Sequence, residues 1–122
     1  PLAQGTLAGR YTNTDKFPGD SRATQKAVFA ERITPEGIVA ATRMAEYAGR
    51  KGITPAQFAV AWVLNQPVVT GSIIGPRTLE QFRDLLPSAD IELTADDRDF
   101  CDSLVPPRSH LSNHFNTADW MK

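Results

Sequence analysis

The spacing of apolar residues predicts a helix that starts near Thr34, has Arg50 and Lys51 in its last turn and ends at Gly52. Thr34 and Pro35 are residue types favoured at a helix start, and Gly52 is the type favoured just past a helix end. Between them, five apolar residues recur at helical spacing and would form one face. They are Ile38, Ala41, Met44, Ala45 and Ala48. This face would pack against a core.

Three further helix starts are predicted by threonines in capping positions. Residues 54–57 and residues 78–81 each have a threonine followed three residues later by a glutamine, the pattern of a capping box. Proline would end both helices, after Gln66 and at Pro87, and a last helix would run from Thr94 to about residue 104. The apolar side of the helix after Thr54 comprises Phe58, Ala61, Trp62 and Val63.

Residues 68–74 form a β-branched apolar run with little alternation. Such a run is typical of a strand buried on both faces, as in parallel sheets covered by helices. One strand cannot form a sheet by itself. The pattern therefore predicts part of an α/β fold whose remaining strands lie elsewhere, and the start at Pro1 leads us to expect a piece of a longer polypeptide.

The segment between residues 4 and 26 has no sustained period and is rich in Gly, Pro, Asn, Thr and Ser. We expect a long loop there. Loops of this length inside compact domains are uncommon and tend to be functional. Arg22 in this loop is either a ligand contact or a surface charge.

Composition narrows the classes of partner. The 122 residues suffice for one domain, and a net charge of −1 predicts neither nucleic-acid binding nor attachment to acidic membranes. No apolar stretch is long enough to cross a bilayer, and no secretion signal is visible. The single cysteine, Cys101, allows no internal disulfide and favours a reducing cytoplasm.

An anion site is predicted where the apolar run meets the helix after Thr78. Backbone N–H groups near Gly75 and at the helix start lack helical partners, and Arg77 adds a guanidinium that matches phosphate oxygens. The alternative from local chemistry is an ordinary strand–turn–helix with a solvated arginine. Both interpretations remain open at this point.

Other reactive residue types are assigned structural roles. His110 and His114 have zinc-like spacing but no acidic partner, so no metal site is predicted. Cys101 is expected to be a packed thiol rather than a nucleophile. The aspartates of the last helix are interpreted mostly as a solvated face with N-terminal dipole partners. They are Asp96, Asp97, Asp99 and Asp102. The aromatic residues Phe115 and Trp120 would cover a pocket or dock the terminus.

Three motifs together resemble the C-terminal part of an aldo-keto reductase, in the branch that includes the potassium-channel β-subunits and their bacterial relatives. PLAQGTLAGRY (residues 1–11) is similar to the segment after the seventh barrel strand, and PGDSRA (18–23) to part of the cofactor-covering loop. IIGPRTLEQ (73–81) is similar to the eighth strand and the adenosine-phosphate motif. The helix with Gln57 and Trp62 matches the segment between them, and the similarity weakens after about Leu104.

The resemblance implies a (β/α)8 TIM barrel, of which residues 1–122 would be a C-terminal, mostly helical portion. Residues 1–27 would contain the end of strand 7 and the cofactor loop, 28–104 the helices and strand 8, and 105–122 a tail. It also implies NADP(H), held at the C-terminal ends of the strands.

The resemblance further implies roles for ten residues. Those near the pyrophosphate and nicotinamide ribose would be Leu2, Gln4, Gly5 and Leu7. Those contacting phosphate or the adenosine side would be Arg10 and Arg22. The 2′-phosphate would be held by Gly75 and Arg77, and the adenosine ribose and base by Gln81 and Asp84. Two departures are Pro76, which removes one backbone donor, and Leu85, which stands where relatives often carry an asparagine.

The implied activity is NADPH-dependent reduction of aldehydes or ketones. The family's catalytic Asp, Tyr, Lys and His lie on earlier strands, and neither Tyr11 nor Tyr47 matches the catalytic tyrosine. We therefore assign no catalytic residue and expect this chain alone to be inactive. The partners would be a small carbonyl substrate and the upstream remainder of the barrel, with oligomerisation left open.

Two alternatives have different functions. One is a non-catalytic module that binds a nucleotide or completes a barrel with a partner chain. The other is a helical nucleic-acid-binding domain that uses the helices after Thr54 and Thr78, against which the near-neutral charge argues.

Overall fold

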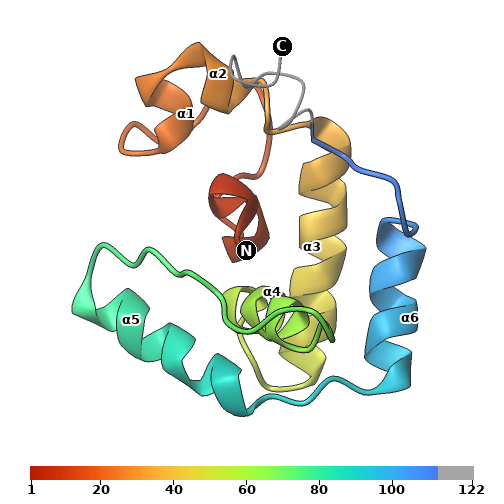
Figure 1. Ribbon diagram of the computed structural model, residues 1–122. Helices are drawn as coiled ribbons and strands as arrows, with labels where there is room; N and C mark the ends of the chain where they lie inside the picture. Colours follow the sequence, from red (N-terminus) through yellow and green to blue (C-terminus); the bar gives the residue numbers. More distant parts are fainter. Residues whose placement is uncertain (113–122) are drawn as a thin grey trace.

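The computed structural model describes residues 1–112, and this part is built from helices joined by turns and extended segments (Figure 1). The helices longer than one turn are α3 (Pro35–Arg50), α4 (Pro55–Leu64), α5 (Leu79–Leu85) and α6 (Ala95–Leu104). The shorter ones are the 3₁₀ helices η1 (Ala3–Ala8) and η2 (Leu86–Asp90) and the single turns α1 (Arg22–Gln25) and α2 (Ala27–Ala30).

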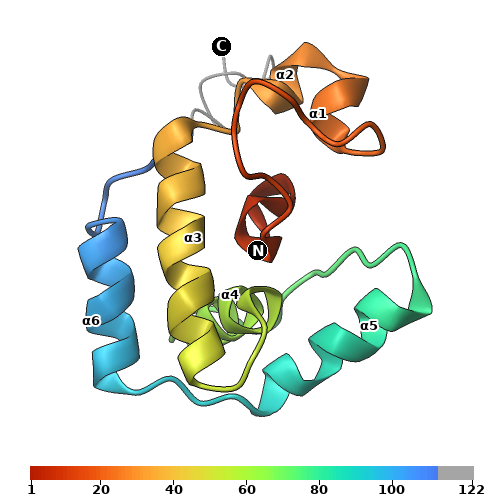
Figure 2. The same ribbon diagram turned by 180° about the vertical axis from the view of Figure 1, so that it is seen from behind.

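α3 is the central element of this arrangement. Figures 1 and 2 show α6 beside α3, α4 crossing near its C-terminal end, and η1 lying between α3 and the two peripheral groups α1–α2 and α5. The chain thereby forms two arms, one carrying α1 and α2 and the other carrying α5. η1 and α4 lie at the base between them.

The predicted caps explain where the long helices begin. The side-chain oxygen of Thr34 accepts a hydrogen bond from the N–H of Gly37, and a complete capping box joins Thr54 to Gln57. A second complete box joins Thr94 to Asp97, so the predicted α3, α4 and α6 are all confirmed. Each cap satisfies backbone donors that have no partner within the helix.

The predicted apolar face of α3 is buried against two small cores. Ile38 packs with Tyr11, Ala23 and Ile33 at one end of the helix. The other cluster, at the opposite end, is larger and includes residues of α4 as well as Leu93. It consists of Met44, Ala48, Phe58, Ala59, Ala61 and Leu93. On α4 the expected apolar side is only partly correct, because 37% of Trp62 is exposed.

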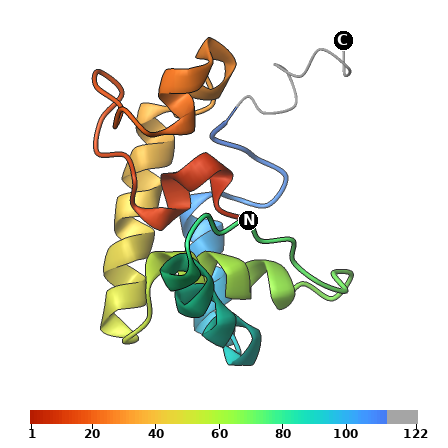
Figure 3. The ribbon, with the colours of Figure 1, turned by 90° about the vertical axis from the view of Figure 1, so that its left-hand side faces the viewer.

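The predicted strand over residues 68–74 is absent. No strand occurs in residues 1–112, and the segment from α4 to α5 runs as an extended coil (Figure 3). Val68 and Ile73, expected to be buried on both faces, are 91% and 92% exposed. The physical reason is that a strand requires neighbours to accept its ladder hydrogen bonds, and the described residues supply none.

The predicted long loop over residues 4–26 is also partly wrong, because it contains η1 and α1. η1 closes through positive φ angles at Gln4 (62°), Gly5 (104°) and Gly9 (70°). Glycine adopts such angles without a Cβ clash, whereas Gln4 adopts its angle at a cost. The glycines that were interpreted as loop punctuation thus shape a compact helical turn.

Asp97 corrects the interpretation of the acidic helix. Its side chain is fully buried, accepts hydrogen bonds from both the backbone and the hydroxyl of Thr94, and accepts a further one from the Tyr47 hydroxyl at 2.8 Å. Burial alone would raise the pKa of Asp97, but hydrogen bonds from Lys51, Thr94 and Tyr47 outweigh it and hold the pKa well below its usual value. The same contact raises the pKa of Tyr47, since the neutral hydroxyl is the donor.

Cys101 is a packed thiol, as predicted. It is half-buried at the edge of the larger core, and this burial raises its pKa to about 11. A thiol that holds its proton at neutral pH is a poor nucleophile.

Candidate functional site

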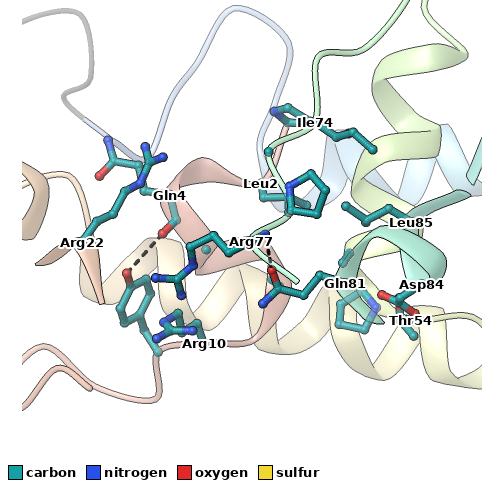
Figure 4. Close-up of a pocket in the computed structure, with 18 residues that line it drawn as sticks. Leu2, Gln4, Arg10, Arg22, Thr54, Ile74, Arg77, Gln81, Asp84 and Leu85 are labelled. Atoms are coloured by element: carbon teal, nitrogen blue, oxygen red, sulfur yellow. Dashed lines mark hydrogen bonds between the residues drawn. The ribbon is translucent and has the colours of Figure 1, made fainter. Parts of the chain in front are cut away.

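A cavity of about 560 Å³ lies between the two arms, with η1 and the start of α4 on its inner side. Figure 4 shows side chains from several separate segments pointing toward it. Its lining residues are Pro1, Leu2, Gln4, Gly5, Ala8, Arg10, Tyr11, Arg22, Thr54, Pro55, Ala56, Ile74, Gly75, Pro76, Arg77, Gln81, Asp84 and Leu85. The lining combines apolar side chains with guanidinium groups.

All of the predicted cofactor residues except Leu7 line this cavity. They come from three parts of the chain that are distant in sequence, namely residues 2–10, Arg22 and residues 75–84. Leu7 instead packs against the larger core cluster, which Leu2 also contacts. The fold therefore brings together the positions that the three motifs singled out separately.

η1 presents an unusual backbone to the cavity. Ala3 and Gln4 both have positive φ, at 45° and 62°. The Tyr11 hydroxyl donates a hydrogen bond to the Gln4 carbonyl at 3.1 Å, and a Cβ added to Gly5 would lie 3.3 Å from Cδ of Arg10. The side-chain Oε1 of Gln4 is buried and has no partner. Strained, over-determined backbone of this kind clusters at ligand sites.

Two of the cavity's arginines meet at Asp20, which sequence reasoning did not single out. Asp20 Oδ2 lies 2.5 Å from Nη2 of Arg10 and 3.9 Å from Nη2 of Arg77. Arg77 Nη1 also donates to the backbone carbonyl of Asp20 at 3.4 Å. The hydrogen bond from Arg10 is the main cause that lowers the pKa of the Asp20 carboxyl. The sequence signal that could have indicated Asp20 was its position in PGDSR, directly after Gly19 and two residues before Arg22.

Arg22 is the third arginine of the cavity. Its side chain is exposed, and within residues 1–112 it has no hydrogen-bond or ion-pair partner. In Figure 4 its guanidinium lies beside Gln4. Arg22 thus lines the cavity and is exposed at the same time, so its placement agrees both with a ligand contact and with a surface charge.

The start of α5 has fewer free backbone N–H groups than the sequence predicted. Thr78 Oγ1 accepts from the N–H of Gln81 at 3.2 Å, as a cap should. The side chain of Gln81, however, turns back to accept from the N–H of Arg77 at 2.8 Å, so the predicted capping box at Thr78 is incomplete. Two of the amides expected to be free are therefore satisfied internally. The side chain of Arg77 is 57% exposed, and its guanidinium remains the main cationic group at this corner.

Asp84 is joined to the start of α4. Its Oδ2 accepts from the Thr54 hydroxyl at 3.3 Å, and the Gln57 side-chain amide donates to its backbone carbonyl at 2.7 Å and to Oδ1 at 3.4 Å. These contacts connect α4 to α5 across the floor of the cavity. Thr54 and Gln57 were predicted as capping residues alone, and nothing in the local pattern indicated that they also hold Asp84.

Within the part of the chain that the structure describes, no group of three metal-ligating side chains occurs, and no helix is both long and apolar enough to span a bilayer. His114, Phe115 and Trp120 lie outside the described residues.

Comparison with known proteins places this site in a family. The family model for the aldo/keto reductase family matches residues 1–106. This chain belongs to the aldo/keto reductase family. It is 34% identical to Protein tas of Escherichia coli K12 over 95 residues, which are 78% of this chain and 27% of that protein.

Two further relatives agree with this assignment. The chain is 33% identical to the uncharacterized oxidoreductase YrpG of Bacillus subtilis over 93 residues, covering 76% of this chain and 26% of YrpG. It is 34% identical to L-glyceraldehyde 3-phosphate reductase of E. coli K12 over 89 residues, which are 69% of this chain and 25% of that protein. The chain spans about a quarter of the length of these aldo/keto reductase relatives.

Proposed function

We propose that this chain is the C-terminal NADP(H)-binding portion of an aldo-keto reductase that reduces aldehydes or ketones by hydride transfer. The observation that carries the proposal is the cavity into which Arg10, Arg22 and Arg77 converge from three separate segments. A dinucleotide with several phosphates needs such a set of cations, and the family membership supplies the reaction class.

The residues present fit this cofactor. Guanidinium forks match phosphate oxygens, and the Nε of Arg10 is buried without a partner. Apolar side chains of the same cavity offer surface to the base and nicotinamide rings, and the unpartnered Oε1 of Gln4 can accept a hydrogen bond. These apolar residues are Leu2, Ile74, Pro76 and Leu85.

The assignment of residues to parts of the cofactor follows the motif order. Leu2, Gln4, Gly5 and Leu7 would lie near the pyrophosphate and nicotinamide ribose, with Leu7 packed on the core behind η1, and Arg10 and Arg22 near phosphate or the adenosine side. Gly75 and Arg77 would hold the 2′-phosphate, with Gln81 and Asp84 near the adenosine. Nothing lies within 4 Å of a Cβ built at Gly75, so the space beside its backbone is open to a ligand. The contacts of Asp84 to α4 would fix its position.

The NADPH cofactor, when bound, would supply the hydride. The described residues of the cavity include no lysine and no histidine, and the one tyrosine, Tyr11, donates a hydrogen bond to the Gln4 carbonyl. We therefore assign binding and orientation to these residues and no catalytic role. Proton transfer to the carbonyl substrate would come from the upstream part of a (β/α)8 barrel, and this chain alone would not reduce substrate.

The exposed coil between α4 and α5 supports the need for that upstream part. Val68 and Ile73 are apolar, β-branched and almost fully exposed. Pairing with neighbouring barrel strands would bury both and would form the eighth strand predicted from the sequence. Oligomerisation and the cytoplasmic location stay predictions.

Replacement of Arg77 by alanine in the full polypeptide tests the proposal. We expect NADPH to bind at least tenfold more weakly and NADH to bind with little change, since only NADPH has the 2′-phosphate. Arg83→Ala, in the helix α5 that follows Arg77 but outside the cavity lining, is the matched control. Both affinities would be measured by cofactor fluorescence titration. Unchanged discrimination in Arg77→Ala would remove Arg77 from the cofactor site.

A further inference from the structure

Asp20 lies where an anionic ligand of the two arginines would lie. Its carboxylate makes a close ion pair with Arg10 and a longer one with Arg77, two residues that line the cavity, and its own side chain is 73% exposed. Arg10 follows η1 and Arg77 precedes α5, and the contact from Arg77 to Asp20 spans 57 residues of sequence. One carboxylate therefore pairs with two arginines that line the same cavity.

We propose that Asp20 is an internal counter-anion that competes with the ligand's phosphate for Arg10 and Arg77 and so lowers the preference for NADP(H) over NAD(H). This inference rests on the proposed function, because it presumes that Arg77 binds a phosphate. Because it pairs with Asp20, Arg77 binds phosphate more weakly than an unpaired guanidinium would. It is thus a specificity-determining residue, one that acts through the arginines.

The contacts of the arginines to Asp20 favour their exchange for contacts to a phosphate. Arg10 lines the cavity, its Nη2 pairs with Asp20 and its Nε is buried without a partner, so its guanidinium has a donor that Asp20 does not use. Arg77 holds Asp20 only through the longer contacts of 3.9 and 3.4 Å, which are easily exchanged for a closer phosphate. Arg22, with no partner in the described chain, is left fully positive.

The charge state of Asp20 is constant across the range in which enzymes are assayed. The neighbouring Arg10 lowers the pKa of the carboxyl below its ordinary value, so Asp20 remains ionised at neutral and mildly acid pH. The competition therefore gains no pH dependence from Asp20 in this range, and it depends on ionic strength. Salt would weaken it, because the groups are at the surface.

Asp20→Asn tests this inference, with Asp15→Asn as the matched control. Asp15 is an exposed carboxylate of the same segment that does not line the cavity, and its backbone N–H donates to the side chain of Asn13. We expect Asp20→Asn to bind NADP⁺ about fivefold more tightly at low salt, from removal of one unit charge near 4 Å in water. NAD⁺ should gain less, and Asp15→Asn should change neither affinity. The gain should fall toward unity in about 1 M salt.

Inorganic pyrophosphate separates this inference from the proposed function. In isothermal titration of the full polypeptide, Asp20→Asn should bind pyrophosphate several-fold more tightly than wild type, and Asp20→Glu should restore the wild-type affinity. If wild type binds NADP⁺ but Asp20→Asn binds it no more tightly, or more weakly, the counter-anion role is overturned and the cofactor site stands. If wild type binds neither NADP⁺ nor 2′,5′-ADP, both proposals fail.

Discussion

Lys51 donates to both carboxylate oxygens of the buried Asp97, at 2.7 and 2.9 Å. The pair joins the C-terminal end of α3 to the first turn of α6, where Asp97 already serves as the acidic member of the capping box. Tyr47 completes the group, and its ring stacks on Phe100 with centroids 3.9 Å apart. α6 is thus held to α3 by an ion pair and an aromatic stack rather than by a broad apolar face.

Replacement of Lys51 by methionine should lower the free energy of unfolding by about 2 kcal/mol. The variant leaves the Asp97 carboxylate buried with only hydroxyl and amide partners, which is costly, but part of Lys51 is exposed and the cost is reduced accordingly. Arg50→Met is the control, since Arg50 only lies over the Tyr47 ring at 5.3 Å. Urea denaturation followed by circular dichroism measures both. Equal losses in the two variants would contradict the importance of the ion pair.

The lowered pKa of Asp97 predicts a loss of stability in acid. As the pH falls below the ordinary aspartate value, the unfolded chain binds the proton before the folded chain does, so the folded state loses its advantage progressively. Above that value the full contribution is present. We expect the stability of wild type to fall more steeply than that of Asp97→Asn between about pH 4 and pH 2.

Asp96→Asn is the comparison for the acid prediction. Asp96 is exposed in the same first turn of α6, so its removal should leave the steep acid limb intact. Thermal unfolding at a series of pH values gives the slopes. A wild-type slope that matches Asp97→Asn would show that Asp97 is not the group responsible.

The features that could be predicted from the sequence are those with local causes. The caps at Thr34, Thr54 and Thr94 and the apolar periodicity of α3 depend on neighbouring residues only, and all appear as expected. The strand over 68–74 depends on partner strands that the described residues lack, so the segment forms no strand despite its β-branched pattern. Local pattern predicts what a segment favours, and only its surroundings decide whether that preference is met.

The candidate site follows the same division. The motifs singled out arginines and glycines that do line one cavity, but they could not show the contacts between segments. Asp20 reaches Arg77 across 57 residues, and Thr54 reaches Asp84 across 30 residues. The burial of Asp97 was missed for the same reason, because an acidic helix face looks solvated until a lysine from another helix is placed against it.

Gln57 provides the last prediction, because one side chain serves both α4 and α5. Its Oε1 accepts from the N–H of Thr54 at 2.9 Å, and its Nε2 donates to the Asp84 carbonyl at 2.7 Å. Gln57→Ala should therefore lower the free energy of unfolding by about 1–2 kcal/mol, since a cap and a contact between helices are lost together. Because α5 follows directly on Arg77, NADPH affinity should fall as well.

Gln66→Ala is the control for this prediction. The Gln66 amide donates only within its own turn, to the Trp62 carbonyl, so the variant should change stability by less than about 0.5 kcal/mol. Denaturation and NADPH titration of both variants measure these effects, and a loss of stability in Gln57→Ala without weaker NADPH binding would show that the position of α5 does not govern the cofactor site.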